Sequence, residues 1–228
     1  MTENGSTAPT VGGTATGLGP RLRQLRNARG ISVRELARRA GCSASLVSQV
    51  ERGVTTPSAS VVYALANELG VSLDALFGTG DLPKTAPASS APGDALAPPP
   101  TASHHWGRAS GANGTGIVQR AGDRSVIELS TGVRWERLTP THDDRVDFLE
   151  VVYAPGGQSC DGGQAVRHDG REYLYVLQGE LEAVIGFDTL RLGEGDSLAF
   201  DPATPHQYRN RTTRIARALS VVVHNPAG

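Results

Sequence analysis

A segment near the N-terminus carries short polar side chains at a spacing that suits contact with DNA bases. If residues 44–52 form a helix, its large apolar residues fall within one arc of about 100° and leave a small polar face. Gln49 can pair bidentately with adenine, and the hydroxyls of Ser45 and Ser48 can contact bases or phosphates. We therefore expect the polar face to dock in a major groove. The apolar arc consists of Leu46, Val47 and Val50, and the polar face of Ala44, Ser45, Ser48, Gln49, Glu51 and Arg52.

The surrounding sequence predicts the helices that must hold this segment. Apolar residues recur at helical spacing from residue 20 to residue 77 and predict five short helices. Ser32 and Glu35 form a capping box for a helix over 33–40, and Gly41 begins a three-residue turn that leads to the helix over 44–52. A capped helix, a short turn and a second helix have the spacing of a helix-turn-helix.

These residues also resemble the lambda-repressor-like (XRE-type) helix-turn-helix family. The resemblance rests on the runs LRNARGIS (25–32), ELA (35–37), AGCS (40–43), LVSQVERG (46–53) and LGVS (69–72). It implies that 44–52 is the recognition helix, whose DNA-facing residues are Ser43, Ala44, Ser45, Ser48 and Gln49. Candidates for phosphate contacts are Arg34, Arg38 and Arg52. Glu51 is interpreted as structural, because phosphates repel a carboxylate. The alternative is a five-helix bundle that binds proteins.

From residue 116 onward the pattern changes to short β-rich runs separated by Gly, Pro and Asp. Many short strands without intervening helices predict a β-sandwich or barrel. The predicted strands cover 117–120, 125–129, 133–138, 146–153, 172–177, 181–185, 189–192, 197–200, 206–209 and 215–224.

Three motifs in this β-rich part resemble the cupin double-stranded β-helix, or jelly roll. They are HDGREYLYVLQG (168–179), GEGD (193–196) and PHQYRN (205–210). The resemblance implies one divalent metal held by two closely spaced His, a Glu and a distant His. Glu172 matches the Glu, His168 the second His and His206 the distant His, but Val166 stands at the first His position.

The substitution at Val166 leaves the role of the remaining three residues open. Two imidazoles and a carboxylate can form a three-ligand site with open positions, which suits iron, zinc or nickel. An apolar corner, however, fits a ligand-binding cavity better than a catalytic centre. We favour the interpretation that His168, Glu172 and His206 satisfy one another in the mouth of a barrel that binds a small effector. One divalent metal is retained as an alternative, and we expect that the chain is not an enzyme.

Composition and charge narrow the class of protein further. With 38% hydrophobic and 20% charged residues, the chain is not wholly disordered or fibrous. It has no apolar run of membrane-helix length and residues 1–17 do not resemble a signal peptide, so we expect a cytoplasmic protein without a membrane partner. Residues 1–78 carry eight Arg and five acids, a net charge of +3 that is compatible with DNA. Cys42 and Cys160 are expected to be buried thiols.

The predicted domain organisation has four parts. Residues 1–17 lack large apolar side chains and are expected to form a disordered tail before a helix-turn-helix domain over 18–78. A linker over 79–105, rich in Pro and Ala, is expected to be flexible and not to couple its neighbours rigidly. The cupin sensor domain is expected over 106–228.

A DNA-reading module, a linker and a barrel together resemble the bacterial XRE-cupin transcription regulators. The resemblance implies a homodimer that places two recognition helices on successive major grooves of a near-palindromic double-stranded operator, roughly 34 Å apart or a multiple of that. A small-molecule effector in the barrel would then shift the dimer between arrangements. Two alternatives stay open: a metal-dependent cupin enzyme with a regulatory DNA-binding domain, and an antitoxin-like protein whose barrel binds a protein partner.

Overall fold

The computed structural model describes residues 17–77, 117–161 and 165–225. The tail predicted over 1–17 and the linker predicted over 79–105 lie outside these ranges, apart from Gly17. The boundaries predicted near residues 78 and 106 fall outside them as well, so the division into domains stays a prediction.

Five α-helices form the helical part of the described chain, as the apolar spacing predicts. Their facing sides bury Leu22, Leu36, Val47, Leu65 and Leu69 in a common core. The longest helices have 11 residues, and no helix in the described ranges has the length and apolar character needed to cross a bilayer. The helices are α1 (Leu18–Ala28), α2 (Val33–Arg39), α3 (Ala44–Glu51), α4 (Ala59–Leu69) and α5 (Asp74–Phe77).

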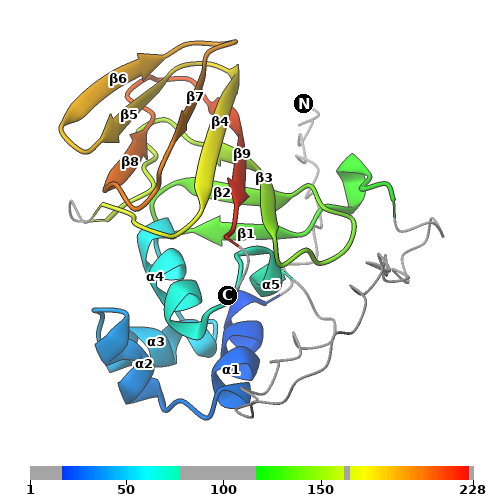
Figure 1. The fold of residues 1–228 in the computed structure, drawn as a ribbon, viewed down its shortest axis with the longest axis vertical. Helices are drawn as coiled ribbons and strands as arrows, with labels where there is room; N and C mark the ends of the chain where they lie inside the picture. Colours follow the sequence, from blue (N-terminus) through cyan, green and yellow to red (C-terminus); the bar gives the residue numbers. More distant parts are fainter. Residues whose placement is uncertain (1–16, 78–116, 162–164, 226–228) are drawn as a thin grey trace, which may run out of the picture.

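Nine strands in the rest of the described chain form two antiparallel sheets (Figure 1). Six pair in the order β1, β2, β3, β9, β4, β7, and three pair in the order β6, β5, β8. Short antiparallel strands in two sheets are the double-stranded β-helix that the motifs predict. The strands are β1 (Val126–Leu129), β2 (Val133–Arg137), β3 (Val146–Tyr153), β4 (Arg171–Gln178), β5 (Leu181–Ile185), β6 (Asp188–Leu192), β7 (Ser197–Phe200), β8 (His206–Arg209) and β9 (Ala216–Val223).

The strand predicted over 117–120 is wrong. Ile117 and Val118 are 74% and 49% exposed, and a short 3-10 turn (Ala121–Asp123) follows them. Strand β1 is the edge of its sheet, and no other described strand pairs with its outer side. An apolar run that has neither a partner strand nor a buried face is not stabilised in the extended conformation of a strand.

Strand β4 shows how the sequence places functional side chains. Its burial alternates, so that Glu172, Leu174 and Val176 are buried while Tyr173 and Tyr175 are about half exposed. This alternation follows from the two-residue period of a strand. Because β4 lies between β9 and β7, its inward side chains reach the interior of the barrel.

The helical part packs directly against the barrel, on the side formed by α4 and α5 (Figure 1). The Ser130 amide donates to the carbonyl oxygen of Pro57 at 3.0 Å, and the Ser60 amide donates to that of Ser159 at 3.2 Å. The sequence predicted no rigid coupling through the linker. In the structure, the two parts are joined instead by this direct contact, which local sequence patterns do not reveal.

Asp74, at the start of α5, is fully buried in this contact. Its Oδ1 accepts a hydrogen bond from the Thr139 hydroxyl at 2.5 Å. Its Oδ2 accepts one from the Asp143 amide at 3.0 Å and lies 2.9 Å from Nδ1 of His142. The amide of Asp74 in turn donates to Oδ1 of Asp147 at 2.8 Å. A buried carboxylate is tolerated only when it is well bonded, so these partners fix α5 to the barrel.

The contact between α5 and the barrel should weaken as the pH rises. Asp147, which accepts the bond from the Asp74 amide, is also bonded by His224. Nε2 of His224 lies 2.8 Å from Oδ2, and this hydrogen bond raises the pKa of His224 above its usual value despite the opposing effect of burial. A raised pKa means that the stabilisation is complete below about pH 6.5 and is lost as the pH rises through the folded-state pKa. The slope cannot exceed about 1.4 kcal/mol per pH unit for one proton.

Urea unfolding at several values between pH 6 and pH 8.5 measures this effect. We expect the free energy of unfolding to fall with pH more steeply in the wild type than in His224→Gln, which cannot acquire the charge. Parallel curves for the two proteins would contradict the assignment.

The two cysteines differ in burial. Cys160 is completely buried, as predicted, but Cys42 is only partly buried, so that prediction is corrected for Cys42. Cys42 lies in the turn between α2 and α3, where the chain passes over the surface of the helical core. Neither forms a disulfide.

Candidate functional site

The turn before α3 is built as the sequence predicts. Gly41 has φ of +67°, a conformation that other residues adopt rarely. The Ser43 hydroxyl accepts a hydrogen bond from the Leu46 amide at 3.0 Å and caps α3. Val47 and Val50 are buried beneath the helix, whereas Leu46 is only partly buried. Helix α3 is therefore held from behind, with its opposite face free.

The free face of α3 carries the predicted base-reading side chains. Ser43 and Ser45 are exposed, and Ala44, Ser48 and Gln49 are half-buried. The amide nitrogen Nε2 of Gln49 donates to Oγ of Ser45 at 3.2 Å across one helical turn. The structure therefore brings the amide and the hydroxyl together, and such a weak, solvent-facing bond can be exchanged for bonds to a base edge.

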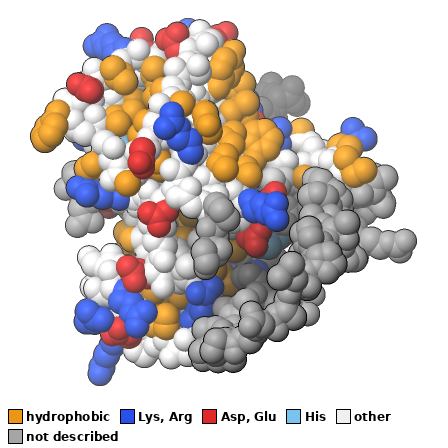
Figure 2. Space-filling view, in the orientation of Figure 1, with side chains coloured by type: hydrophobic (Ala, Val, Ile, Leu, Met, Phe, Trp, Pro, Cys, Tyr) orange, Lys and Arg blue, Asp and Glu red, His pale blue; other side chains and the backbone are white. Residues whose placement is uncertain are grey.

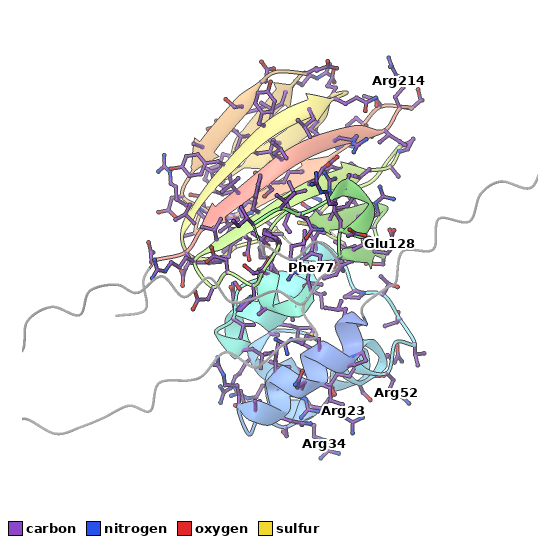
Figure 3. All side chains as sticks on the ribbon, turned by 90° about the vertical axis from the view of Figure 1, so that its right-hand side faces the viewer. Arg23, Arg34, Arg52, Phe77, Glu128 and Arg214 are labelled. Atoms are coloured by element: carbon purple, nitrogen blue, oxygen red, sulfur yellow. The ribbon has the colours of Figure 1, made fainter. Side chains whose placement is uncertain are left out.

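The predicted phosphate contacts lie at the end of the molecule farthest from the barrel. Arg34 and Arg52 are exposed and, with Arg23, project from that end (Figure 3). Nε of Arg52 donates to the backbone oxygen of Ser48 at 3.1 Å, which holds the guanidinium beside α3. A duplex lying on α3 could be reached by these side chains without meeting the barrel.

Arg38 differs from Arg34, because it is already paired. Its Nη2 lies 2.7 Å from Oε1 of Glu35, and Nε of Arg39 lies at the same distance. Hydrogen bonds from these two guanidinium groups lower the pKa of Glu35 to about 2. The predicted capping box is only half formed, since the Glu35 amide bonds Ser32 while the carboxylate bonds the two arginines.

His168, Glu172 and His206 converge inside the barrel. Oε2 of Glu172 lies 3.0 Å from Nε2 of His168 and 3.4 Å from Nε2 of His206. One ligand atom from each residue lies within 4.8 Å of the other two, and all three side chains are about 2% exposed. Strand β4 supplies Glu172, strand β8 supplies His206, and the segment before β4 supplies His168.

The hydrogen bonds behind the two imidazoles orient their inner nitrogens. Nδ1 of His168 lies 3.1 Å from the backbone oxygen of Asp169, and Nδ1 of His206 lies 3.0 Å from that of Thr204. A carbonyl oxygen only accepts, so each Nδ1 carries a proton. Burial lowers the pKa of His206, which therefore is neutral at pH 7 and presents the lone pair of Nε2 to the Glu172 carboxylate.

Nε2 of His168 and Oε2 of Glu172 lie at hydrogen-bond distance, so a shared proton satisfies this pair, and a divalent cation held by all three residues would satisfy it as well. Backbone oxygens that fix the tautomer of a ligand histidine are typical of metal sites. The second Glu172 oxygen is held by the Tyr208 hydroxyl, which donates to Oε1 at 2.7 Å. Burial, the charge of Glu172 and this hydrogen bond raise the pKa of Tyr208 well above its ordinary value, so the phenol keeps its proton. The donor set and its supporting bonds thus fit a divalent cation.

The cavity beside Glu172 and His206 is small. It has a volume of about 20 Å³, enough for one water molecule or one ion. Its lining includes Glu172, His206, Tyr208 and Val166, so the residue at the position of the family's first His does face the cavity. Pockets for drug-sized ligands have roughly 300 Å³ or more, and even one benzene-sized ring needs about 150 Å³, so the cavity in this conformation is too small for an organic effector.

A side chain from the helical part closes the cavity. The ring of Tyr63, on α4, stacks on the imidazole of His168 with centroids 4.6 Å apart and planes at 7°. It also meets Trp135 edge to face at 5.5 Å. Burial and the nearby charge of Glu172 raise the pKa of Tyr63 well above its ordinary value. The two parts of the chain thus share one cavity.

Comparisons with known proteins agree with both halves of this geometry. The helix-turn-helix family model matches residues 22–76, and the cupin domain family model matches residues 149–222. The helix-turn-helix transcriptional regulator PuuR of Escherichia coli K12 is 25% identical over 91% of this chain and 94% of its own length. The chain is a helix-turn-helix transcriptional regulator with a C-terminal cupin domain.

Two further comparisons cover different lengths of the regulator. A crystal structure of a helix-turn-helix transcriptional regulator from Vibrio cholerae superposes with a TM-score of 0.59 and 20% identity, over 95% of this chain and 99% of that one. An uncharacterised helix-turn-helix transcriptional regulator of Mycobacterium tuberculosis is 43% identical over 56 residues, which are 25% of this chain and 40% of that protein. The first likeness extends through both domains and shows that the Vibrio cholerae protein and this chain have the same fold.

Several residues of the regulator's cavity were missed by sequence reasoning. Tyr208 was not assigned to the site, although its alternation with His206 on a predicted strand places both on one face. Tyr63 was missed because it belongs to the other domain. A signal was nevertheless present: Ala59, Tyr63 and Asn67 are spaced four residues apart on α4, away from the face that includes Leu65. Such a second stripe indicates a second packing partner.

Proposed function

We propose that the regulator is a homodimer that binds a near-palindromic operator in cytoplasmic DNA through α3, and whose barrel holds a divalent metal and a small effector. The observation that carries this proposal is the division of exposure within one chain. The polar face of α3 and the exposed side chains of Arg34 and Arg52 lie away from the barrel. The convergent donors His168, Glu172 and His206 are buried inside the barrel. The proposal therefore assigns DNA binding and effector binding to separate parts of the chain.

The base-reading role of α3 makes a direct prediction for Ser45 and Gln49. Replacing both with alanine should reduce discrimination between the preferred duplex and a scrambled duplex, because a bidentate amide contact contributes about 1–3 kcal/mol. This corresponds to a loss of about 5- to 150-fold in the affinity ratio. Selection from a random duplex pool identifies the preferred duplex, and titration at constant salt then measures both affinities and the number of chains bound per duplex.

A matched variant separates base reading from general attraction to DNA. Arg34→Ala should weaken binding to both duplexes in parallel, since phosphate contacts carry no sequence information. Unchanged discrimination in the Ser45→Ala, Gln49→Ala double variant would sink the proposal. Binding of one chain per duplex would remove the homodimer from it.

A face of the barrel suits the second copy of the chain. Tyr173 and Tyr175 are 46% and 45% exposed and border a groove of about 320 Å³ together with Leu219 and Val221. Figure 2 shows hydrophobic side chains gathered over this face of β4, β7 and β9. Exposed apolar patches rimmed by polar groups mark interaction sites, and symmetric dimers are the commonest oligomers. We assign the dimer contact to this face.

The metal and effector share the cavity in this proposal. His168, Glu172 and His206 would hold the cation, which would leave coordination positions open to a ligand. Val166 keeps the fourth corner apolar, and the cavity in its present size admits no organic substrate beside a metal. The apolar corner favours a sensor over an enzyme, because it lacks one ligand of the family's metal site and suits a ligand-binding cavity better than a catalytic centre.

A further inference from the structure

Tyr63 occupies the space that a ligand of the barrel would need. Its ring lies flat against His168 and packs edge to face with Trp135, and it lines the cavity beside Glu172 and Tyr208. With this ring in place, the remaining volume is about 20 Å³. A ligand larger than a few atoms therefore cannot reach the donors unless Tyr63 leaves.

We propose that the effector is a small compound with a flat ring that takes the place of the Tyr63 side chain, and that its entry opens the α4 side of the contact between the two domains. This inference rests on the proposed sensing function of the barrel. It adds the chemical class of the effector and the route by which its binding reaches the DNA-binding domain.

The class of ligand follows from the residues around the space that the Tyr63 ring now fills, which we call the slot. His168 offers a parallel ring and Trp135 a ring nearly perpendicular to it, and aromatic pairs of both kinds are stabilised beyond their buried area. The same cavity also has polar lining, since Glu172 and Tyr208 border it and bond each other. A flat ring with one polar substituent, the shape of the phenol that the protein itself supplies, matches both features.

Bonds on either side of Tyr63 tie its movement to that of the domain. The Ser60 amide donates to the Ser159 oxygen at 3.2 Å, and Nδ2 of Asn67 donates to the Arg167 oxygen at 3.1 Å. Ala59, one helical turn before Tyr63, is 1% exposed and lines the same cavity. Because α4 is held this closely along its length, displacement of the ring pushes the helix from the barrel.

Helix α4 passes this displacement to the DNA-binding surface. It contributes Val62, Leu65 and Leu69 to the same core that holds α3 through Val47. A closely packed core moves as a unit. In the closed form, the DNA-binding domain is held at α4 and the position of α3 is fixed. In the open form, the DNA-binding domain is released at α4. A ligand in the space of the Tyr63 ring shifts the regulator to the open form because it binds that form better.

The amide of Ser60 gives a specific readout of this contact. It lies in the first turn of α4, where amides have no partner within the helix, and it bonds Ser159 of the barrel. Its protection from hydrogen exchange therefore reports on closure of the domains. The Ser130 amide, which bonds Pro57 from the barrel side, gives a second readout.

The test uses the full chain without metal or DNA and 4-methylphenol, the side-chain analogue of tyrosine, as probe. We expect Tyr63→Ala to bind 4-methylphenol at least about tenfold more tightly than the wild type, because the wild type must first open and its affinity is reduced by the open fraction. In the wild type, exchange at Ser60 and Ser130 should rise with occupancy. In Tyr63→Ala, occupancy should cause no such rise, because ligand and closed domains are then compatible.

Three controls make the result specific. Tyr63→Phe retains the ring and should behave like the wild type, as should Glu68→Ala, on the part of α4 that faces Arg38. The saturated analogue 4-methylcyclohexanol, which is not flat, should bind Tyr63→Ala at least about tenfold more weakly than 4-methylphenol. If Tyr63→Ala does not fold, Tyr63→Val, which keeps an apolar contact with Trp135, takes its place.

Several results would overturn the inference: equal affinity of the wild type and Tyr63→Ala for 4-methylphenol, no binding to Tyr63→Ala, equal binding of the saturated analogue, or wild-type binding with unchanged exchange at Ser60. The last would mean that the ring rotates aside without moving the domain. A failure of the proposed function is recognised separately, since the metal and operator titrations involve neither the probe nor the exchange measurement.

Discussion

Glu172→Ala is expected to lower the affinity of the regulator for Co²⁺ or Zn²⁺ by more than about 100-fold, a larger loss than that of a supporting residue around a metal. Glu172 is the one charged donor of the three, and its Oε2 lies within 3.4 Å of both imidazole nitrogens. Without it, only the two imidazoles remain as donors, and the Tyr208 hydroxyl loses its acceptor. Competition with a chromophoric chelator at pH 7.5 measures the affinity.

Two variants make this result specific to the cavity. Glu172→Gln retains an acceptor for Tyr208 and should lose metal affinity while the barrel stays folded. Glu182→Ala removes a carboxylate of β5 that pairs with Arg211 at 3.1 Å on the barrel surface, and it should bind metal like the wild type. If Glu172→Ala retained wild-type affinity, the three residues would only satisfy one another, which is the interpretation that the sequence favoured.

The fold was predictable wherever the sequence carries a local signal. The strand predicted over 146–153 has the same bounds as β3. The apolar side chains within this run indicate which residues are buried, and turn residues mark both of its ends. The run over 117–120 has similar residues but no partner strand, and pairing is a property of the sheet that no local window contains. Propensity therefore identified the residues that could extend, and topology decided which of them did.

The candidate site was predictable within one domain and unpredictable across two. His168, Glu172 and His206 came from motif spacing, which the strands β4 and β8 convert into proximity. Tyr63 and Asp74 meet the barrel only because the domains pack together, and sequence gives no register for that contact. The contact of His142 with Asp74 across the domains likewise has no local signal in the sequence.

Glu51→Ala is expected to reduce the stability of the helix-turn-helix domain by about 3–5 kcal/mol, the range for breaking one side of a buried ion pair. Glu51 was interpreted as structural, and its two oxygens lie 2.5 and 2.9 Å from Nε and Nη2 of Arg26. Both side chains are at most 10% exposed. The variant would leave the guanidinium of Arg26 buried with only the Ile31 oxygen as a partner among these bonds.

Urea unfolding followed by the helical circular dichroism signal measures the loss. Since domains are stable by only about 5–15 kcal/mol, operator binding should fall with the folded fraction of the domain, while metal binding in the barrel persists. Glu35→Ala, which breaks a comparable set of contacts with Arg38 and Arg39 on the exposed face of α2, should leave unfolding nearly unchanged. A loss in Glu51→Ala no larger than that in Glu35→Ala would show that Arg26 finds water or another acceptor, and that α3 is positioned by its apolar face alone.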